Sequence, residues 1–440
     1  MVTTGANFRL EDFLHFKEVI TRGTYKEQLD TLNKLRKASS VEIDPPLQLI
    51  IKAELVPVLM KWHKENEAPE ATLQDILWTL ANIASGESSE TLYMVQQGAI
   101  EYFMEWATYS SESIYSQALW GLANIAGESS KFRDFLLDKG GLQRCLDIYY
   151  KRRETMKIET RRTLAWLVNN LCRNKPAVAF KKVEECVPYL ADSLKDQDHD
   201  IVVENLWACA YLTEINEDVI RALTNKNIIS QVAGHITANI ERLTVVTPAL
   251  KTLSNVVSGN DEVTEKLLNM NILPVIASLL TSEKPVIRRE ACFFFSNIAA
   301  TSPNHINFAF SLPNFLSTLV NMIQKDESGI VNEVIWIVAN SLMGNTIAHA
   351  KKVINAEVFP CIFKKLAVVS KRTQLMGLEG FRELLNHVMD MPDTPQALIG
   401  QIRYYQLHVE PVYESLNDEQ FEKTLDDIHR LILDIMDSFQ

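Results

Sequence analysis

A helical pattern recurs about every 42 residues along this 440-residue chain. The segments LWTLANIASGESS (residues 77–89) and LWGLANIAGESS (residues 119–130) are nearly identical, and each places a tryptophan four residues before an asparagine. Two residues with this spacing lie on the same face of a helix. A repeat of this length is typical of solenoids built from two or three helices per unit.

Seven positions in the chain follow this pattern or fill a gap in it, and we call each pair a rung. In chain order, the rungs are Trp78/Asn82, Trp120/Asn124, Trp166/Asn170, Trp207/Tyr211, Lys251/Asn255, Phe293/Asn297 and Trp336/Asn340. A single pair of this kind is usually a satisfied part of a core, because an asparagine that is buried without partners is costly. Because the pair recurs at the same position of successive repeats, it is better explained as a row of side chains that faces a ligand.

The residues between the rungs predict further helices in each unit. Each rung is followed by a short turn such as SGESSET, in which serine is a good N-cap for the next helix. A glycine or asparagine then marks another break, as in QQGAIEYF and NMNILPVI. The whole chain has only 15 glycines and 15 prolines, which suits long helices. We therefore expect an all-α fold, one extended solenoid of about ten repeats without room for a catalytic domain.

Composition and motifs argue against several classes of function. The net charge of -12 disfavours nucleic acid as a partner, because a phosphate backbone needs a basic surface, and it favours basic partners. The six scattered cysteines lack metal-ligand spacing. Without a glycine-rich phosphate loop, a GxSxG elbow or an HExxH motif, we expect neither an enzyme nor a cofactor. The sequence also lacks an apolar run of about 18 residues, so we expect no membrane partner.

The order of the rungs resembles the armadillo repeats of importin-α (karyopherin-α), the adaptor that carries nuclear localisation signals. The resemblance includes Tyr211 in place of asparagine and Lys251 where the family has arginine, and it runs from about Pro45 to Glu379. It implies a right-handed superhelical armadillo-repeat solenoid. Residues 45–390 would hold the repeats and a peptide-binding groove, and residues 391–440 a C-terminal capping repeat. Residues 1–44 would form an N-terminal segment and first helices without the basic cluster that binds importin-β in the family.

A groove lined by rungs suits an extended basic peptide. The third helix of every repeat lines the concave face of such a solenoid, so the rungs form two parallel rows. Asparagine amides can donate to and accept from the backbone of the peptide. The slots between indoles can hold the aliphatic stem of lysine or arginine while its cation meets the ring faces, a contact worth about 0.5 to 2 kcal/mol.

The resemblance places a major binding site in the first half of the chain. Glu128 matches an acidic position that receives the main lysine of the signal, and Gly86 and Thr91 match positions whose carbonyl and hydroxyl bind the same lysine. The predicted major site comprises Trp78, Asn82, Gly86, Thr91, Trp120, Asn124, Glu128, Trp166, Asn170, Glu204 and Tyr211.

A minor site is expected in the second half of the chain. It comprises Lys251, Asn255, Phe293, Asn297, Glu333, Trp336 and Asn340. Phe293 stands where tryptophan is usual, and phenylalanine is the weaker cation–π surface. The sequence therefore predicts a preference for signals with a single basic cluster.

The predicted function is a nuclear import adaptor that shuttles between cytoplasm and nucleus. Its implied partners are cargo proteins with lysine- or arginine-rich signals, a nuclear export receptor, and importin-β only if the full protein has the missing domain. Either truncation or a natural member without that domain would explain the absence of the basic cluster. The alternative is a general armadillo scaffold for other peptide tails. A scaffold for acidic tails would line its groove with lysine and arginine rather than with Glu128, Glu204 and Glu333.

Overall fold

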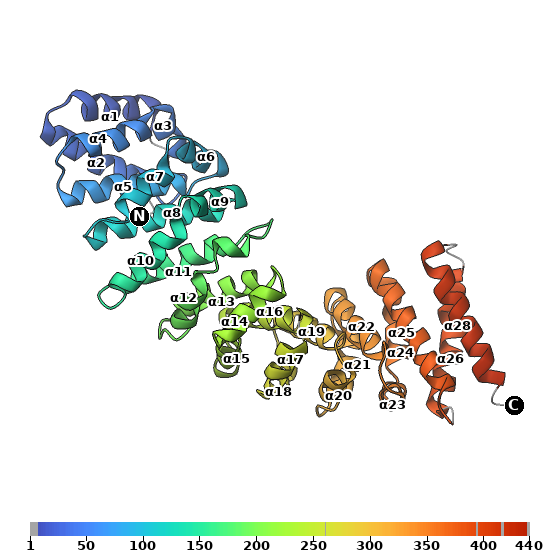
Figure 1. Cartoon of the computed structure of the whole chain (residues 1–440). Coiled ribbons are helices and arrows are strands. Elements are labelled where there is room, and N and C mark those ends of the chain that lie inside the picture. The colour runs from blue at the N-terminus through green and yellow to red at the C-terminus, as the bar shows by residue number, and fades with distance from the viewer. Residues whose placement is uncertain (1–7, 260, 393–394, 415–417, 438–440) are drawn as a thin grey trace. The chain divides into compact units, whose positions relative to one another are not determined.

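The computed structural model describes residues 8–259, 261–392, 395–414 and 418–437, which form helices joined by short turns (Figure 1). These residues contain no strand, which confirms the predicted all-α class. The chain divides into two compact units, Met1–Ile215 and Asn216–Gln440. Each unit is a stack of the helical repeats that the sequence predicts.

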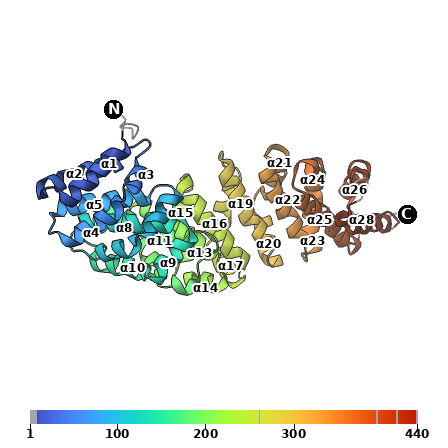
Figure 2. The same cartoon turned by 90° about the horizontal axis from the view of Figure 1, so that it is seen from above.

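The first unit begins with the helix pair α1 (Leu10–Arg22) and α2 (Tyr25–Ser39) and continues in repeats of three helices. These helices are α3 (Leu47–Lys52), α4 (Leu55–Glu65), α5 (Glu70–Ala84), α6 (Ser88–Gln96), α7 (Ala99–Trp106), α8 (Glu112–Glu128), α9 (Ser130–Asp138), α10 (Gly141–Arg152), α11 (Ile158–Cys172), α12 (Cys186–Ser193) and α13 (His199–Thr213). In the last repeat, the short 3-10 helix η2 (Phe180–Lys182) takes the place of the first helix. The last helices of successive repeats, from α2 through α5, α8 and α11 to α13, pack side by side (Figures 1 and 2).

The second unit repeats the same plan. Its helices are α14 (Glu217–Asn225), α15 (Ile228–Ala238), α16 (Leu243–Gly259), α17 (Asp261–Leu268), α18 (Ile272–Leu279), α19 (Pro285–Ile298), α20 (Pro303–Phe310), α21 (Phe315–Lys325), α22 (Ser328–Leu342), α23 (Ile347–Asn355), α24 (Val358–Lys365), α25 (Lys371–Met389), α26 (Gln396–His408), α27 (Glu410–Glu414) and α28 (Glu419–Asp437), with the 3-10 helix η3 (Leu366–Val368) before α25. The third helices α16, α19, α22, α25 and α28 again pack side by side.

The number of repeats agrees with the prediction of about ten. Nine repeats and the leading pair α1–α2 lie within the described ranges. Helices α1 and α2 lie within the predicted N-terminal segment and α26–α28 within the predicted C-terminal segment, whose capping role stays a prediction. Within the same ranges, no single helix combines the length and apolarity needed to cross a bilayer, although the bent pair α20 and α21 meets both criteria together.

Left-handed backbone residues separate the first and second helices of most repeats. They are Glu54, Gly98, Gly140, Asn227, Asn271, Asn314 and Glu357, with φ between 48° and 83°. Glycine and asparagine enter this region at low cost, because a β-carbon otherwise approaches the backbone too closely. This requirement explains the glycine and asparagine signal in the sequence.

Replacing Glu357 by glycine is expected to stabilise the second unit. Glu357 is exposed and has a φ of 48°, so the substitution relieves backbone strain without removing a buried side chain. The free energy of unfolding in urea should rise by about 0.5 to 1 kcal/mol, which is the relief of strain less the entropy that glycine adds to the unfolded chain. Asn314→Ala, at the equivalent position of the preceding repeat, should lower the same quantity. If Glu357→Gly instead lowers the free energy of unfolding, the interactions of the Glu357 carboxylate contribute more to stability than the left-handed backbone costs.

Candidate functional site

Every rung lies on the third helix of its repeat. Helices α5, α8, α11 and α13 carry the rungs of the predicted major site, and α16, α19 and α22 carry those of the predicted minor site. Each compact unit therefore contains one of the two predicted sites. The rung tryptophans are half-buried, so part of each indole packs against the core and part remains open.

The rung asparagines connect neighbouring repeats. Asn124 donates from Nδ2 to the carbonyl oxygen of Ala81, the residue before the preceding rung asparagine, at 3.1 Å. The same bond joins Asn170 to Ala123 (3.0 Å), Asn297 to Ser254 (2.8 Å) and Asn340 to Ser296 (3.2 Å). The sequence predicted that these amides bind a ligand backbone, and it did not foresee that they also link the repeats. Each of these bonds uses one N–H, so the second N–H and the amide oxygen are the parts of the group that can still bind a ligand where the side chain is exposed.

Two predicted site residues have buried side chains. Asn170 is 0% exposed and lies against Gly127, where a β-carbon would come within 2.9 Å of Nδ2. Thr91 is 1% exposed, and its hydroxyl donates to the carbonyl of Ala84 at 3.1 Å. The structure therefore gives both residues a part in holding the helices together. Their contact with a ligand stays a prediction.

The predicted acidic residues lie beside the rungs. Glu128, at the end of α8, accepts a hydrogen bond from Ser88 at the start of α6, two residues beyond Gly86. Glu204, on α13, accepts a hydrogen bond of 2.6 Å from Nδ2 of Asn169 on α11. Burial raises the pKa of Glu204, and this hydrogen bond partly opposes the shift. An incoming cation would favour the charged carboxylate.

The second unit contains a cavity of about 450 Å³ that brings together most of the predicted minor site. Its lining includes Phe293, Asn297, Glu333, Trp336 and Asn340. Burial raises the pKa of Glu333, and the positive charge of Arg289 opposes the shift. Lys251 and Asn255 are not part of this lining and lie on α16, one repeat earlier.

Two arginines at the rungs were not predicted from the sequence. The guanidinium carbon of Arg36 on α2 lies 5.1 Å from the ring centroid of Trp78, and Asp75 pairs with Arg36 at 2.9 Å between Oδ1 and Nε. Arg372 on α25 lies over Trp336 at 5.0 Å in the same way.

The repeat itself contained a signal for the first arginine. Arg36 and Ser40 stand 42 residues before Trp78 and Asn82, so they form a further rung of different composition. Nδ2 of Asn82 donates to the hydroxyl of Ser40 at 3.0 Å, which connects this rung to the next. Arg372 does not stand one repeat length after Trp336, so the spacing of the rungs did not predict its position.

The side chains around the rungs have the chemistry of a candidate binding surface. Among the residues that the structure describes, no group of three or more histidine, cysteine, aspartate or glutamate side chains could hold a metal ion. The rungs offer half-buried aromatic faces and amides, with carboxylates beside them. This combination can hold a cation and a peptide backbone at the same time.

Comparison with known proteins finds relatives that are named as importin alpha subunits. The chain is similar to Importin subunit alpha-3 of Arabidopsis thaliana, with 33% identity over 270 residues, which is 60% of this chain and 49% of that protein. It is also similar to Importin subunit alpha-1a of Oryza sativa subsp. japonica, with 30% identity over 323 residues, which is 72% of this chain and 59% of that protein. The chain thus spans about half to three fifths of the length of these curated relatives.

Two further comparisons concern the fold. No protein-family model matches the chain. A crystal structure of an engineered protein has a TM-score of 0.84 at 20% sequence identity, covering 96% of this chain and 98% of that one. At this identity the similarity concerns the fold alone.

Proposed function

We propose that this chain, a relative of importin alpha subunits as its rungs predicted, is an adaptor that binds lysine- and arginine-rich nuclear localisation signals of cargo proteins. Such an adaptor works between cytoplasm and nucleus. A nuclear export receptor is a further proposed partner. Importin-β is proposed as a partner only of a longer protein with the additional N-terminal domain.

The stacking of two arginines on rung indoles supports a cationic ligand most directly. The distances of 5.1 Å for Arg36 on Trp78 and 5.0 Å for Arg372 on Trp336 lie within the range of about 6 Å over which a cation and a ring attract. The chain thus places its own guanidinium groups on indole faces of the rungs. Trp120 and Trp166 occupy the same positions on α8 and α11, and a ligand lysine or arginine would pack there in the same way.

The surrounding carboxylates provide the selectivity for positive charge. Glu128 and Glu204 lie beside the major-site rungs, and Glu333 lines the cavity of the minor site. Burial raises the pKa of Glu204 and of Glu333, so both carboxylates gain from a cation that reaches them. An acidic peptide would meet repulsion at the same places.

Fluorescence polarisation with two labelled peptides of equal length, one rich in lysine and one rich in glutamate, tests this proposal. The lysine-rich peptide should bind, and its affinity should fall between about 0.05 and 0.5 M salt because exposed charge pairs are screened. Part of the affinity should persist, because indole packing and amide hydrogen bonds do not depend on ion pairing. Preference for the acidic peptide would instead favour the general armadillo scaffold.

Replacing Phe293 by tryptophan is expected to strengthen the minor site. Phe293 is 39% exposed and lines the cavity with Asn297 and Trp336. A peptide with two basic clusters should bind more tightly by about 0.5 to 1 kcal/mol, because indole is the stronger cation–π surface and the linker couples both clusters. A peptide with one cluster should gain little, as calorimetry on both peptides would show.

Phe308→Trp is the matched control for that measurement. Phe308 lies on α20, is 45% exposed and does not line the cavity, so its replacement should change neither affinity. Equal tightening of both peptides by Phe293→Trp would contradict a separate minor site.

A further inference from the structure

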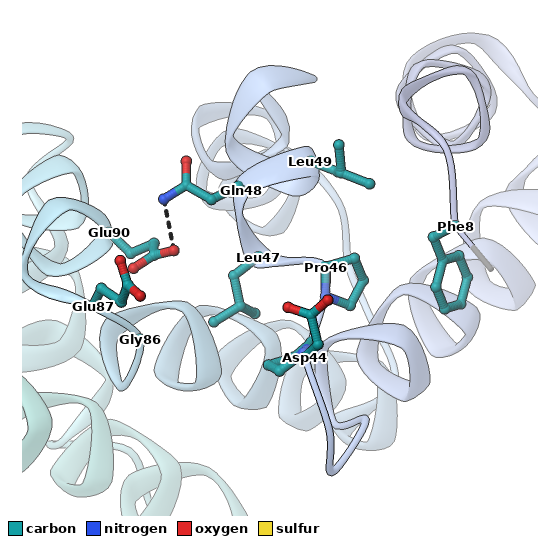
Figure 3. Close-up of a pocket in the computed structure, with 10 residues that line it drawn as sticks. Phe8, Asp44, Pro46, Leu47, Gln48, Leu49, Gly86, Glu87 and Glu90 are labelled. Atoms are coloured by element: carbon teal, nitrogen blue, oxygen red, sulfur yellow. Dashed lines mark hydrogen bonds between the residues drawn. The ribbon is translucent and has the colours of Figure 1, made fainter. Parts of the chain in front are cut away.

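An acidic pocket adjoins the predicted major site and shares only Gly86 with it (Figure 3). It has a volume of about 570 Å³ and lies between the start of α3 and the turn that joins α5 to α6. Asp44, Glu87 and Glu90 contribute three carboxylates to its lining, which contains no lysine or arginine from the described part of the chain. Gly86 lines the pocket and also belongs to the predicted position of the main lysine, whereas Glu128 and Thr91 do not line the pocket, so the two positions adjoin at Gly86.

The carboxylate of Glu90 is incompletely satisfied within the protein. Glu90 is only 5% exposed, and its Oε1 accepts a hydrogen bond of 2.6 Å from Nε2 of Gln48. Its Oε2 is buried without a hydrogen-bond partner. Buried carboxylates are ordinarily paired or fully hydrogen-bonded, because removing their charge from water is costly. An unpartnered oxygen in the wall of a pocket therefore indicates a missing donor.

The walls of the pocket suit a long cationic side chain. Glu87 and Glu90 stand on one side in Figure 3, with Leu47 and Asp44 next to them and Phe8 farther across. Leu47 and Phe8 offer apolar surface for an aliphatic stem, while the carboxylates accept from its charged end. Gly86 makes the arrangement possible, because a β-carbon there would come within 2.9 Å of Oε2 of Glu90.

We propose that this pocket binds a lysine or arginine side chain of the peptide, outside the segment that lies on the rungs. This inference rests on the proposed function, because the ligand is the same basic peptide. Gly86 follows Asn82 by four residues, so the pocket begins where the rung of α5 ends. A side chain that extends from a peptide bound at Trp78 and Asn82 past the end of α5, and not along the rungs toward Arg36 and Ser40, would enter the pocket. The cation then donates to Glu90, and Glu87 and Asp44 add to the attraction.

Polarisation titrations with extended peptides test the proposal. A lysine-rich core peptide is lengthened at either end by a short spacer and one lysine, and the matched peptides carry norleucine instead of that lysine. At one end, lysine should bind the wild-type chain about tenfold more tightly than norleucine, as expected at the lower end of the range for a hydrogen bond to a charged group. Glu90→Gln should abolish this difference and leave the affinity of the core peptide unchanged.

Two further variants complete the comparison. Glu87→Gln, on the exposed rim, should reduce the gain from lysine without disturbing a buried group. Glu184→Gln removes an equal charge from an exposed position before α12 and should preserve the gain. A gain that survives Glu90→Gln, or the absence of a gain at both ends while the core peptide binds, would overturn the inference. A wild-type chain that does not bind the core peptide would count against the proposed function.

A titration with N-acetyl-arginine amide separates the pocket from the rungs. The methyl resonances of Leu47 and Leu49, which line the pocket, should shift in the wild-type chain and not in Glu90→Gln. Unshifted methyl groups in the wild-type chain, or equal shifts in both proteins, would overturn the proposed pocket whatever the core peptide does.

Discussion

Alanine at Trp120 and Trp166 together is expected to weaken the binding of a lysine-rich peptide about 100-fold while the first unit stays folded. Each substitution removes a half-buried indole from neighbouring rungs on α8 and α11. Loss of two aromatic anchors at the centre of an interface is worth about 3 kcal/mol. The hydrogen bonds from Asn124 and Asn170 to the preceding repeats do not involve these indoles and should persist. Polarisation titration and thermal unfolding by circular dichroism measure the two effects.

Trp62→Ala is the matched control, because Trp62 lies off the rungs. It is 5% exposed, and its Nε1 donates to Oε1 of Gln28 at 3.0 Å. Its removal should lower the free energy of unfolding by about 3 kcal/mol and leave the affinity of the folded protein unchanged. If the Trp120 and Trp166 variant unfolds as Trp62→Ala does and its folded fraction still binds the peptide, these indoles belong to the core and not to a groove.

Replacing Arg133 by methionine is expected to destabilise the first unit strongly. Arg133 on α9 is 0% exposed, although its neighbour Asp134, which pairs with it, reaches solvent. The guanidinium donates to the carbonyl oxygens of Arg173 (2.6 Å), Asn174 (3.0 Å) and Pro176 (3.1 Å). Methionine fills a similar space but leaves these carbonyls without their donor, so the free energy of unfolding should fall by about 3 kcal/mol.

Arg153→Met provides the comparison for that experiment. Arg153 pairs with Asp192 at the surface, where its side chain is 41% exposed, so its loss should cost less than about 1 kcal/mol. Amide hydrogen exchange should also show faster exchange in residues 173–175 of Arg133→Met. Equal losses of stability in the two variants would contradict the structural importance of the buried guanidinium.

Periodicity made the repeats and the rungs predictable. A rung that recurs on the same face of each third helix leaves a signal at every step, even where Tyr211 or Lys251 replaces the usual residue. The helix breaks were equally visible, because Gly98 and Asn271 meet a requirement of the backbone itself. Among the breaks that the structure describes between first and second helices, those at Glu54 and Glu357 have a left-handed residue that the sequence does not reveal, because glutamate is unfavourable in this conformation.

Side chains that reach beyond their own helix could not be placed from the sequence. Arg36 shares the phase of the rungs, but its position over Trp78 depends on Asp75, which holds its guanidinium from another helix. The burial of Glu90 likewise depends on its contact with Gln48 of α3, a full repeat earlier. The buried positions of Asn170 and Thr91 follow from the close packing of neighbouring helices, which a pattern of residue types does not specify.

The hydrogen bonds that four rung asparagines, Asn124, Asn170, Asn297 and Asn340, donate to the preceding repeat explain why these positions hold a neutral amide and not an acid. Aspartate at Asn124 has the same shape and would attract cations more strongly, but it has no N–H for the carbonyl of Ala81. Its oxygen would oppose the carbonyl oxygen and separate the repeats. Negative charge is therefore confined to other residues, such as Glu128 and Glu204, where it does not strain the stack. Under the proposed function, contact with the peptide backbone and selection of its charge would thus be divided between two sets of side chains, and a change in one set would leave the other in place.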